Sequence, residues 1–116
     1  MKDNVVKDKS LEFAVRIVNL YKFLVNEQKE FVMSKQILRS GTSIGANIRE
    51  AEQAQSRADF INKLNIALKE ANETEYWLEL WIRTEYITRE QYESINNDST
   101  EINKLLISII KTTKNN

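Results

Sequence analysis

The longest periodic segment of the chain is residues 57–85, RADFINKLNIALKEANETEYWLELWIRTE. Apolar or small side chains recur in it at every third or fourth position: Phe60, Leu64, Ala67, Ala71, Thr74, Leu78 and Trp81. This spacing places them on one face of an α-helix and is typical of a helical bundle. Ser56 and Asp59 resemble a capping box at the start of the helix. Trp77 falls off the seam, and a large aromatic side chain there indicates a second contact surface.

The segment before it, residues 34–54, predicts a second helix. Its inner seam has the same spacing and consists of Ile37, Gly41, Ile44, Ile48 and Ala51. Gly41 and Gly45 stand four residues apart and therefore lie on nearly the same side of the helix. Glycine in a helix interior costs about 1 kcal/mol relative to alanine. We therefore expect the backbone of a neighbouring helix, the preceding or the following one, to approach closely at these positions.

Residues 10–26 predict a helix that begins with Ser10 as its N-cap. Its first apolar stripe, predicted to be the bundle seam, consists of Leu11, Ala14, Val18, Tyr21 and Val25. A second stripe lies beside the first and consists of Phe13, Ile17, Leu20 and Leu24. Together the stripes cover about half the circumference at about 100° per residue, more than one core contact needs. Either this helix is deeply wrapped, or the second stripe is an oligomer contact, with Trp77 nearby.

A fourth helix is expected over residues 88–113, where Thr88 and Gln91 form a capping box and an apolar side follows. Residues 96–100, NNDST, are poor helix formers, which indicates a kink or a frayed turn there. The chain has no proline and only two glycines, so folds rich in tight turns are excluded. Short connections make neighbouring helices antiparallel. The prediction is one all-α domain, residues 1–116, folded as an up-down-up-down four-helix bundle.

Composition excludes several kinds of site. Without histidine or cysteine, the chain has no disulfides, no His-based triad or general base and no zinc site of the usual kind. We expect no catalytic residue, no cofactor and no metal, although an oxygen-only Mg²⁺ or Ca²⁺ site is not excluded by residue type. Seventeen basic residues balance seventeen acidic ones, so net charge does not favour nucleic acid or membranes. The lack of a long apolar run and of a signal-peptide pattern predicts a cytoplasmic protein.

The middle of the chain carries a more specific pattern. It runs through residues 39–48, RSGTSIGANI, followed by Glu50 and Ala51 and then by Asp59 and Phe60. These residues closely resemble the four-helix-bundle proteins encoded by intervening sequences inside bacterial 23S rRNA genes. The resemblance covers the second and third helices strongly, and the first and fourth by pattern only.

That resemblance implies the same up-down bundle and a homo-oligomer, with a five-membered ring as the best guess. One relative is the accessory protein of diversity-generating retroelements, which works with a reverse transcriptase and contacts nucleic acid. The resemblance implies no established enzymatic activity.

Two polar features need a partner or a ligand. On the predicted second helix, one flank beside the apolar seam carries Ser40, Ser43, Asn47 and Glu50. These side chains either hydrogen-bond across a helix interface or line a polar pocket. Glu75 falls at the edge of the third helix's seam, where a half-buried carboxylate needs a partner, such as Arg or Asn from the second helix. A catalytic role would require a second titratable group and a cleft, and the sequence indicates neither.

The outer side of the second helix carries Lys35, Arg39 and Arg49. Three interpretations remain open: a stripe that contacts phosphates, an ordinary solvated face, or pairing with the acidic surface around Glu70 and Glu73 across a subunit contact.

The leading functional hypothesis is a non-enzymatic, homo-oligomeric assembly or accessory protein. Its partner would be RNA, DNA or a nucleic-acid-processing protein. A protein-interaction adaptor without a nucleic-acid role is the alternative. An enzyme that works without His or Cys is the weakest of the three.

Overall fold

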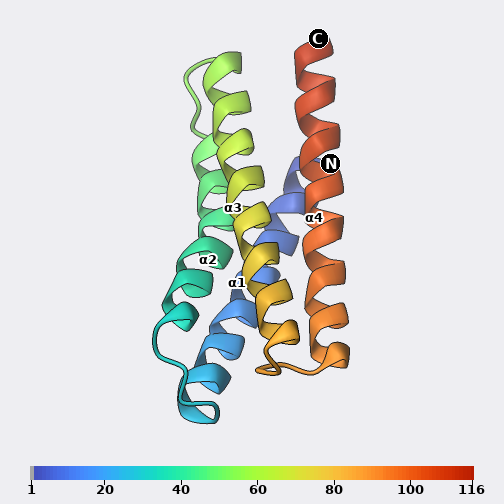
Figure 1. The fold of residues 1–116 in the computed structure, drawn as a ribbon. Helices are drawn as coiled ribbons and strands as arrows, with labels where there is room; N and C mark the ends of the chain where they lie inside the picture. The colour runs from blue at the N-terminus through green and yellow to red at the C-terminus, as the bar shows by residue number, and fades with distance from the viewer. Residues whose placement is uncertain (1) are drawn as a thin grey trace.

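The computed structural model describes residues 2–116, with side chains from residue 5 onward. It contains four helices: α1 (Lys2–Asn26), α2 (Met33–Ala51), α3 (Arg57–Arg83) and α4 (Arg89–Asn115). Successive helices run antiparallel, and the start of α1 and the end of α4 lie toward the end of the bundle that carries the α2–α3 connection (Figure 1). Each helix packs on the next, and α4 closes the bundle against α1. The predicted all-α up-down-up-down bundle is confirmed.

The two stripes of α1 take the opposite roles from those predicted. The stripe interpreted as an oligomer contact is buried in the chain's own core, with exposed fractions of 7% or less: Phe13, Ile17, Leu20 and Leu24. Leu11, from the predicted seam, is 51% exposed. Both stripes have helical spacing, and periodicity alone does not say which one faces the neighbouring helices. The stripe of larger side chains removes more apolar area from water, which favours placing it inside.

Ser10 was predicted to cap α1, and this prediction is wrong. Ser10 lies in the interior of the helix, which begins at Lys2. It is 1% exposed, and its Oγ donates to the carbonyl oxygen of Lys7 at 2.9 Å. Val6, one turn earlier, is buried in the core and continues the face that Phe13 begins. Because this packing extends upstream of Ser10, the helix continues past the candidate cap.

The glycines of α2 face α1. The preceding helix is therefore the neighbour that approaches them closely, and not the following one. A β-carbon on Gly41 would lie 2.7 Å from Cγ1 and 2.8 Å from Cγ2 of Ile17. On Gly45 it would lie 3.3 Å from Oγ and 3.4 Å from the carbonyl oxygen of Ser10. The close approach predicted from the two glycines therefore occurs between α1 and α2, and it is tightest at Gly41.

The helix ends show how the chain turns with so little glycine. Ser56 Oγ accepts from the amide of Asp59 at 3.0 Å, and Thr88 and Gln91 form a reciprocal capping box, so both predicted caps are confirmed. Lys29 and Glu85, in the α1–α2 and α3–α4 connections, take the left-handed conformation with φ of 54° and 66°. Residues 96–100 continue α4 without interruption, in contrast to the expected kink or frayed turn. Buried Ser99 anchors this stretch against the bundle.

The start of α2 is capped by a residue that the sequence did not point to. Glu30 is 7% exposed, and its carboxylate accepts from the amides of Val32, Met33 and Ser34 at 3.2, 2.9 and 2.6 Å. Ser34 Oγ in turn donates to the carbonyl oxygen of Glu30 at 2.8 Å. Burial raises the pKa of the Glu30 carboxyl group, but the three amide donors outweigh it and hold the pKa below its usual range.

Candidate interaction surfaces

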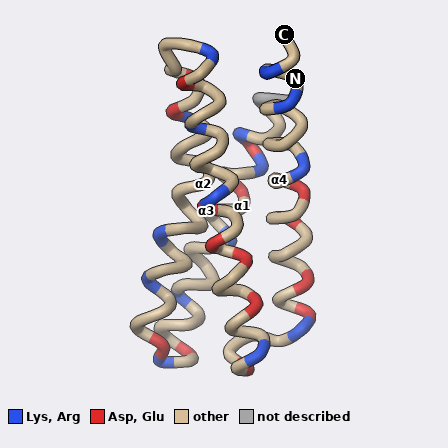
Figure 2. Tube along the Cα trace, turned by 45° about the horizontal axis from the view of Figure 1, so that its top comes forward, with Lys and Arg blue, Asp and Glu red and all other residues tan. Residues whose placement is uncertain are grey.

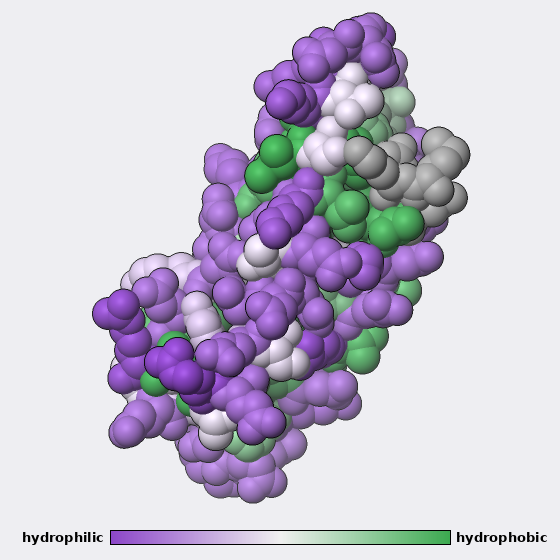
Figure 3. All heavy atoms as spheres, turned by 90° about the vertical axis from the view of Figure 1, so that its right-hand side faces the viewer, coloured by the Kyte–Doolittle hydropathy of each residue, from purple (hydrophilic) through white to green (hydrophobic). Residues whose placement is uncertain are grey.

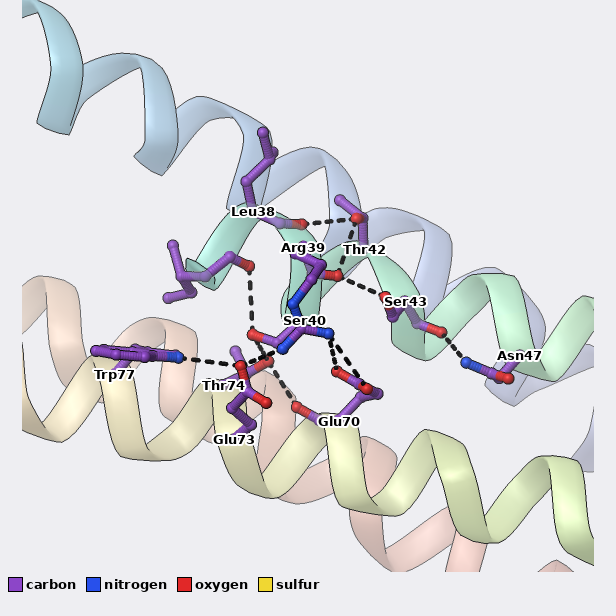
Figure 4. Close-up of polar contacts among 11 residues, drawn as sticks. Leu38, Arg39, Ser40, Thr42, Ser43, Asn47, Glu70, Glu73, Thr74 and Trp77 are labelled. Atoms are coloured by element: carbon purple, nitrogen blue, oxygen red, sulfur yellow. Dashed lines mark hydrogen bonds and ion pairs between the residues drawn. The ribbon is translucent and has the colours of Figure 1, made fainter. Parts of the chain in front are cut away.

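Arg39 of α2 is bound by two acids of α3 (Figure 4). Its Nη1 lies 3.2 Å from Oε2 of Glu70, and its Nη2 pairs with Oε2 of Glu73. The same Glu73 oxygen accepts from Nε1 of Trp77 at 3.3 Å. The acidic partners are those expected for Arg39, but the pairing lies within one chain and not across a subunit contact. Arg39 therefore does not present a free charge to phosphate.

The electrostatics of this cluster follow from its geometry. Burial raises the pKa of the Glu73 carboxyl group, but the hydrogen bonds from Arg39 and Trp77 and the Arg39 charge outweigh it and lower the pKa. The hydrogen bond from Glu73 raises the pKa of the Arg39 guanidinium. Half of the Arg39 side chain is exposed, so the pairing contributes at most about 1 kcal/mol to stability. Its main effect is to cancel charge on this face.

The polar flank of α2 is only partly an interhelical contact. Ser40 is fully buried, and its Oγ lies 2.9 Å from Oγ1 of Thr74 on α3. Ser43 and Asn47 instead donate to carbonyl oxygens of their own helix, at 2.6 and 2.9 Å (Figure 4). Glu50 is exposed. The interhelical interpretation thus holds for Ser40 but is wrong for the other three, because the flank turns away from α3 and leaves backbone carbonyls as the nearest acceptors.

Glu75 is half-buried and bridges α3 to α4. Its Oε1 accepts from Ser99 Oγ at 3.1 Å and from Asn103 Nδ2 at 3.2 Å. The expected partner from α2 is wrong, because Glu75 lies on the side of α3 that faces α4. Two neutral donors hold the carboxylate in place, an arrangement typical of a structural bridge.

The remaining predicted contact residues lie at the surface or at its edge. Lys35 and Arg49 are exposed, and neither has an ion pair among the side chains that the structure describes. Trp77 is half-buried and packs against the core. Its ring meets that of Tyr76 edge to face at 5.2 Å between centroids, and Tyr76 is 60% exposed.

Two exposed apolar residues that the sequence patterns do not single out also lie on the surface. Val15 is 54% exposed on α1 and lies beside Leu11 on the face opposite the core. Ile107 is 55% exposed on α4. Val15 stands four residues after Leu11 and three before Val18, so it widens the first stripe, and a helical wheel centred on the core face reveals it.

No group of three or more metal-ligating side chains occurs in the part of the chain that the structure describes. Among the described helices, none combines the length and apolarity that crossing a membrane requires.

Comparison with known proteins identifies a family of this chain. The family model of the 23S rRNA-intervening sequence proteins matches residues 2–108. The chain belongs to this family. It is similar, at 99% identity, to a protein with unknown function from the S23 ribosomal protein family of Bacteroides thetaiotaomicron VPI-5482, whose crystal structure was determined at 1.70 Å. The similarity covers 96% of this chain and 99% of that chain, with a TM-score of 0.95. A comparison with curated proteins finds no match.

The family match spans most of α4 and all of the other three helices. The resemblance predicted from residues 39–60 is therefore confirmed over nearly the whole chain.

Proposed function

We propose that this chain is a non-enzymatic assembly or accessory protein: a helical bundle that joins with copies of itself and whose further partner is RNA, DNA or a nucleic-acid-processing protein. The observation that carries the self-assembly is the outer face of α1. Leu11 and Val15 are more than half exposed there, and Ala14 and Val18 beside them are half-buried. A solvated helix face normally carries charged or polar side chains. An apolar face of this kind is typical of a contact with another protein.

A second apolar surface supports a ring. Tyr76 and Trp77 form an aromatic pair on α3, and α1 and α3 do not contact each other in the bundle. The two surfaces therefore lie on different sides of the molecule. Contact between the α1 face of one copy and the α3 face of the next is heterologous, and a heterologous contact closes into a ring when its rotation permits. Five subunits is the number that the family resemblance implies.

Light scattering at micromolar concentration tests the assembly. We expect a mass several times that of the 13.6 kDa chain for the wild type, and a large loss of assembly for Leu11→Glu combined with Val15→Glu. Ile107→Glu is the matched control, since it changes an equally exposed apolar residue on α4. A wild-type mass of 13.6 kDa, or equal loss of assembly in the control, contradicts the α1 contact.

The nucleic-acid partner is supported by the family resemblance and by Lys35 and Arg49, which have no ion pair among the described side chains. Co-purification from the native host, with bound protein and nucleic acid both identified, tests this directly. If nucleic acid binds through these side chains, Lys35→Gln with Arg49→Gln should weaken binding and lower its dependence on salt. The matched control is Lys69→Gln with Lys104→Gln, two exposed lysines on other helices.

One observation favours the alternative, a protein-interaction adaptor without a nucleic-acid role. Arg39 is neutralised by Glu70 and Glu73, and basic and acidic residues are interspersed along the helices (Figure 2). Such a surface lacks the single basic field typical of strong nucleic-acid binders. Co-purification of a protein alone, with no RNA or DNA, would decide for the adaptor.

A further inference from the structure

A cavity of about 640 Å³ opens at the end of the bundle that carries the α2–α3 connection. All four helices contribute to its wall: Val6 from α1, Ile48 and Ala51 from α2, Leu64 from α3 and Ile109 from α4. The cavity is therefore bordered by side chains of all four helices. Its volume falls within the range of small-molecule sites, about 300–1,000 Å³.

Seven of the twelve residues that line the cavity are apolar, and the other five are Lys7, Glu52, Ser56, Arg57 and Thr113. Ala51, the last residue of α2, and Ala54, in the α2–α3 connection, are too small to fill the space that the larger side chains surround. Phe60 is half-buried at the start of α3 and also lines the cavity. Toward the upper end of the face that carries α4, apolar atoms lie among hydrophilic side chains (Figure 3). This combination suits a ligand whose larger part is a hydrocarbon chain.

The charges at the cavity favour an anionic end on that ligand. Lys7 is bound to Glu52, with Nζ 3.2 Å from Oε1, so these two charges cancel. Arg57 also lines the cavity, is exposed, and has no ion pair among the described side chains. The lining therefore carries one uncompensated positive charge. It stands at the first residue of α3, whose first turn also carries the carboxylate of Asp59.

We propose that this cavity binds a medium-length acyl chain with an anionic head group, the chain lying among Val6, Leu64 and Ile109 and the head group held by Arg57. The apolar wall supplies affinity through the area it removes from water, and Arg57 sets the orientation. A carboxylate and a phosphate share the chemistry that Arg57 recognises. The site does not depend on self-assembly, because every residue that forms it belongs to one chain.

Calorimetric titration of the full chain with decanoate, below micelle-forming concentrations, tests the site. We expect saturable binding of one decanoate per chain, and weaker binding of decanol, which lacks the charge. Decyl phosphate is titrated in parallel, and the tighter of the two anions identifies the head group. Ala54→Trp should abolish binding by filling the cavity.

The head group is tested with a matched pair of variants. Arg57→Gln should weaken decanoate binding about threefold to fivefold, as expected for one partly solvated ion pair. Arg83→Gln changes net charge equally but does not line the cavity, and should leave the affinity unchanged. The proposal is overturned if no saturable binding occurs, or if Ala54→Trp folds and binds as the wild type does. Equal affinities of the two arginine variants, or of decanol and decanoate, overturn the anionic head group. If Ala54→Trp fails to fold, the two arginine variants and the comparison of decanol with decanoate still test the proposal.

Discussion

A methyl group at position 41 would collide with Cγ1 and Cγ2 of Ile17, at 2.7 and 2.8 Å. These atoms branch directly from the β-carbon, so they cannot swing aside as the end of a long side chain can. At position 45 the nearest atom is Ser10 Oγ at 3.3 Å, and a shift of a few tenths of an ångström relieves the contact. The two glycines therefore make unequal demands on the α1–α2 interface.

We expect Gly41→Ala to lower the free energy of unfolding by about 1–3 kcal/mol, the usual cost of overpacking a tight contact. Gly45→Ala should cost clearly less, because the gain in helix propensity of about 1 kcal/mol offsets the strain. Urea unfolding of both variants checks the difference. Ile17→Ala should recover part of the Gly41→Ala loss in a double-mutant cycle. Equal stabilities for the two glycine variants would contradict the close approach at Gly41.

The Glu30 cap predicts a dependence of stability on pH. Its pKa is lower in the folded chain than in the unfolded one, so its contribution is fully present above the ordinary carboxyl pKa and is lost as pH falls through the lowered value. Glu30→Gln removes the charge that three amides share, and should cost about 1–2 kcal/mol at pH 7. Urea unfolding from pH 7 to pH 3 should show the difference between the two proteins shrinking. A difference that stays constant over this range would contradict the role of the charge.

Among the helices, α1 offers the sharpest contrast between two faces. Phe13 is 1% exposed and Leu11 is 51% exposed, only two residues away. Phe13→Glu should prevent folding, because an unpaired carboxylate in the core costs more than a small domain can supply. Leu11→Glu should leave the melting temperature nearly unchanged. Circular dichroism melts of the two variants measure this, and similar melting temperatures would contradict the reversed roles of the stripes.

The bridge from α3 to α4 allows a matched test at Glu75. Glu75→Ala leaves the Ser99 hydroxyl and the Asn103 amide without their acceptor in a partly buried site, which should cost about 1–3 kcal/mol. Glu79→Ala, one turn later, removes an exposed acid that pairs only with Arg83, and should cost less than about 0.5 kcal/mol. Chemical denaturation compares them. Equal losses would show that the bridge does not hold α4.

The sequence predicted a helix cap or a side-chain contact correctly when the residues that form it lie close together in the chain. Ser56 and Thr88 were correct caps because the cap and its donors lie within four residues. Glu30 was missed because it caps from two residues before the usual position and is not a usual N-cap type. The partner of Glu75 was assigned to α2 because a helical wheel gives the face of a residue but not the neighbour that covers it.

For the whole molecule, helical periodicity, short connections and the scarcity of glycine and proline were enough to predict the bundle and its up-down-up-down order. They could not say that Arg39 meets Glu70 and Glu73 within one chain, since that depends on the rotation of α2 against α3. The cavity was equally invisible in the sequence. It arises where side chains of all four helices meet at one end of the bundle, to which no single residue corresponds.

The position of the two chain ends has a consequence for engineering. The start of α1 and the end of α4 lie toward the same end of the bundle, and α1 and α4 pack against each other (Figure 1). A short flexible linker can therefore join them, while a new opening in the α2–α3 connection, such as between the exposed residues Glu52 and Gln53, leaves every helix intact. Such a circular permutant would have the helix order α3-α4-α1-α2 with each pairwise contact preserved. The bundle is thus a closed cycle of four helices in which the place of the first residue is arbitrary.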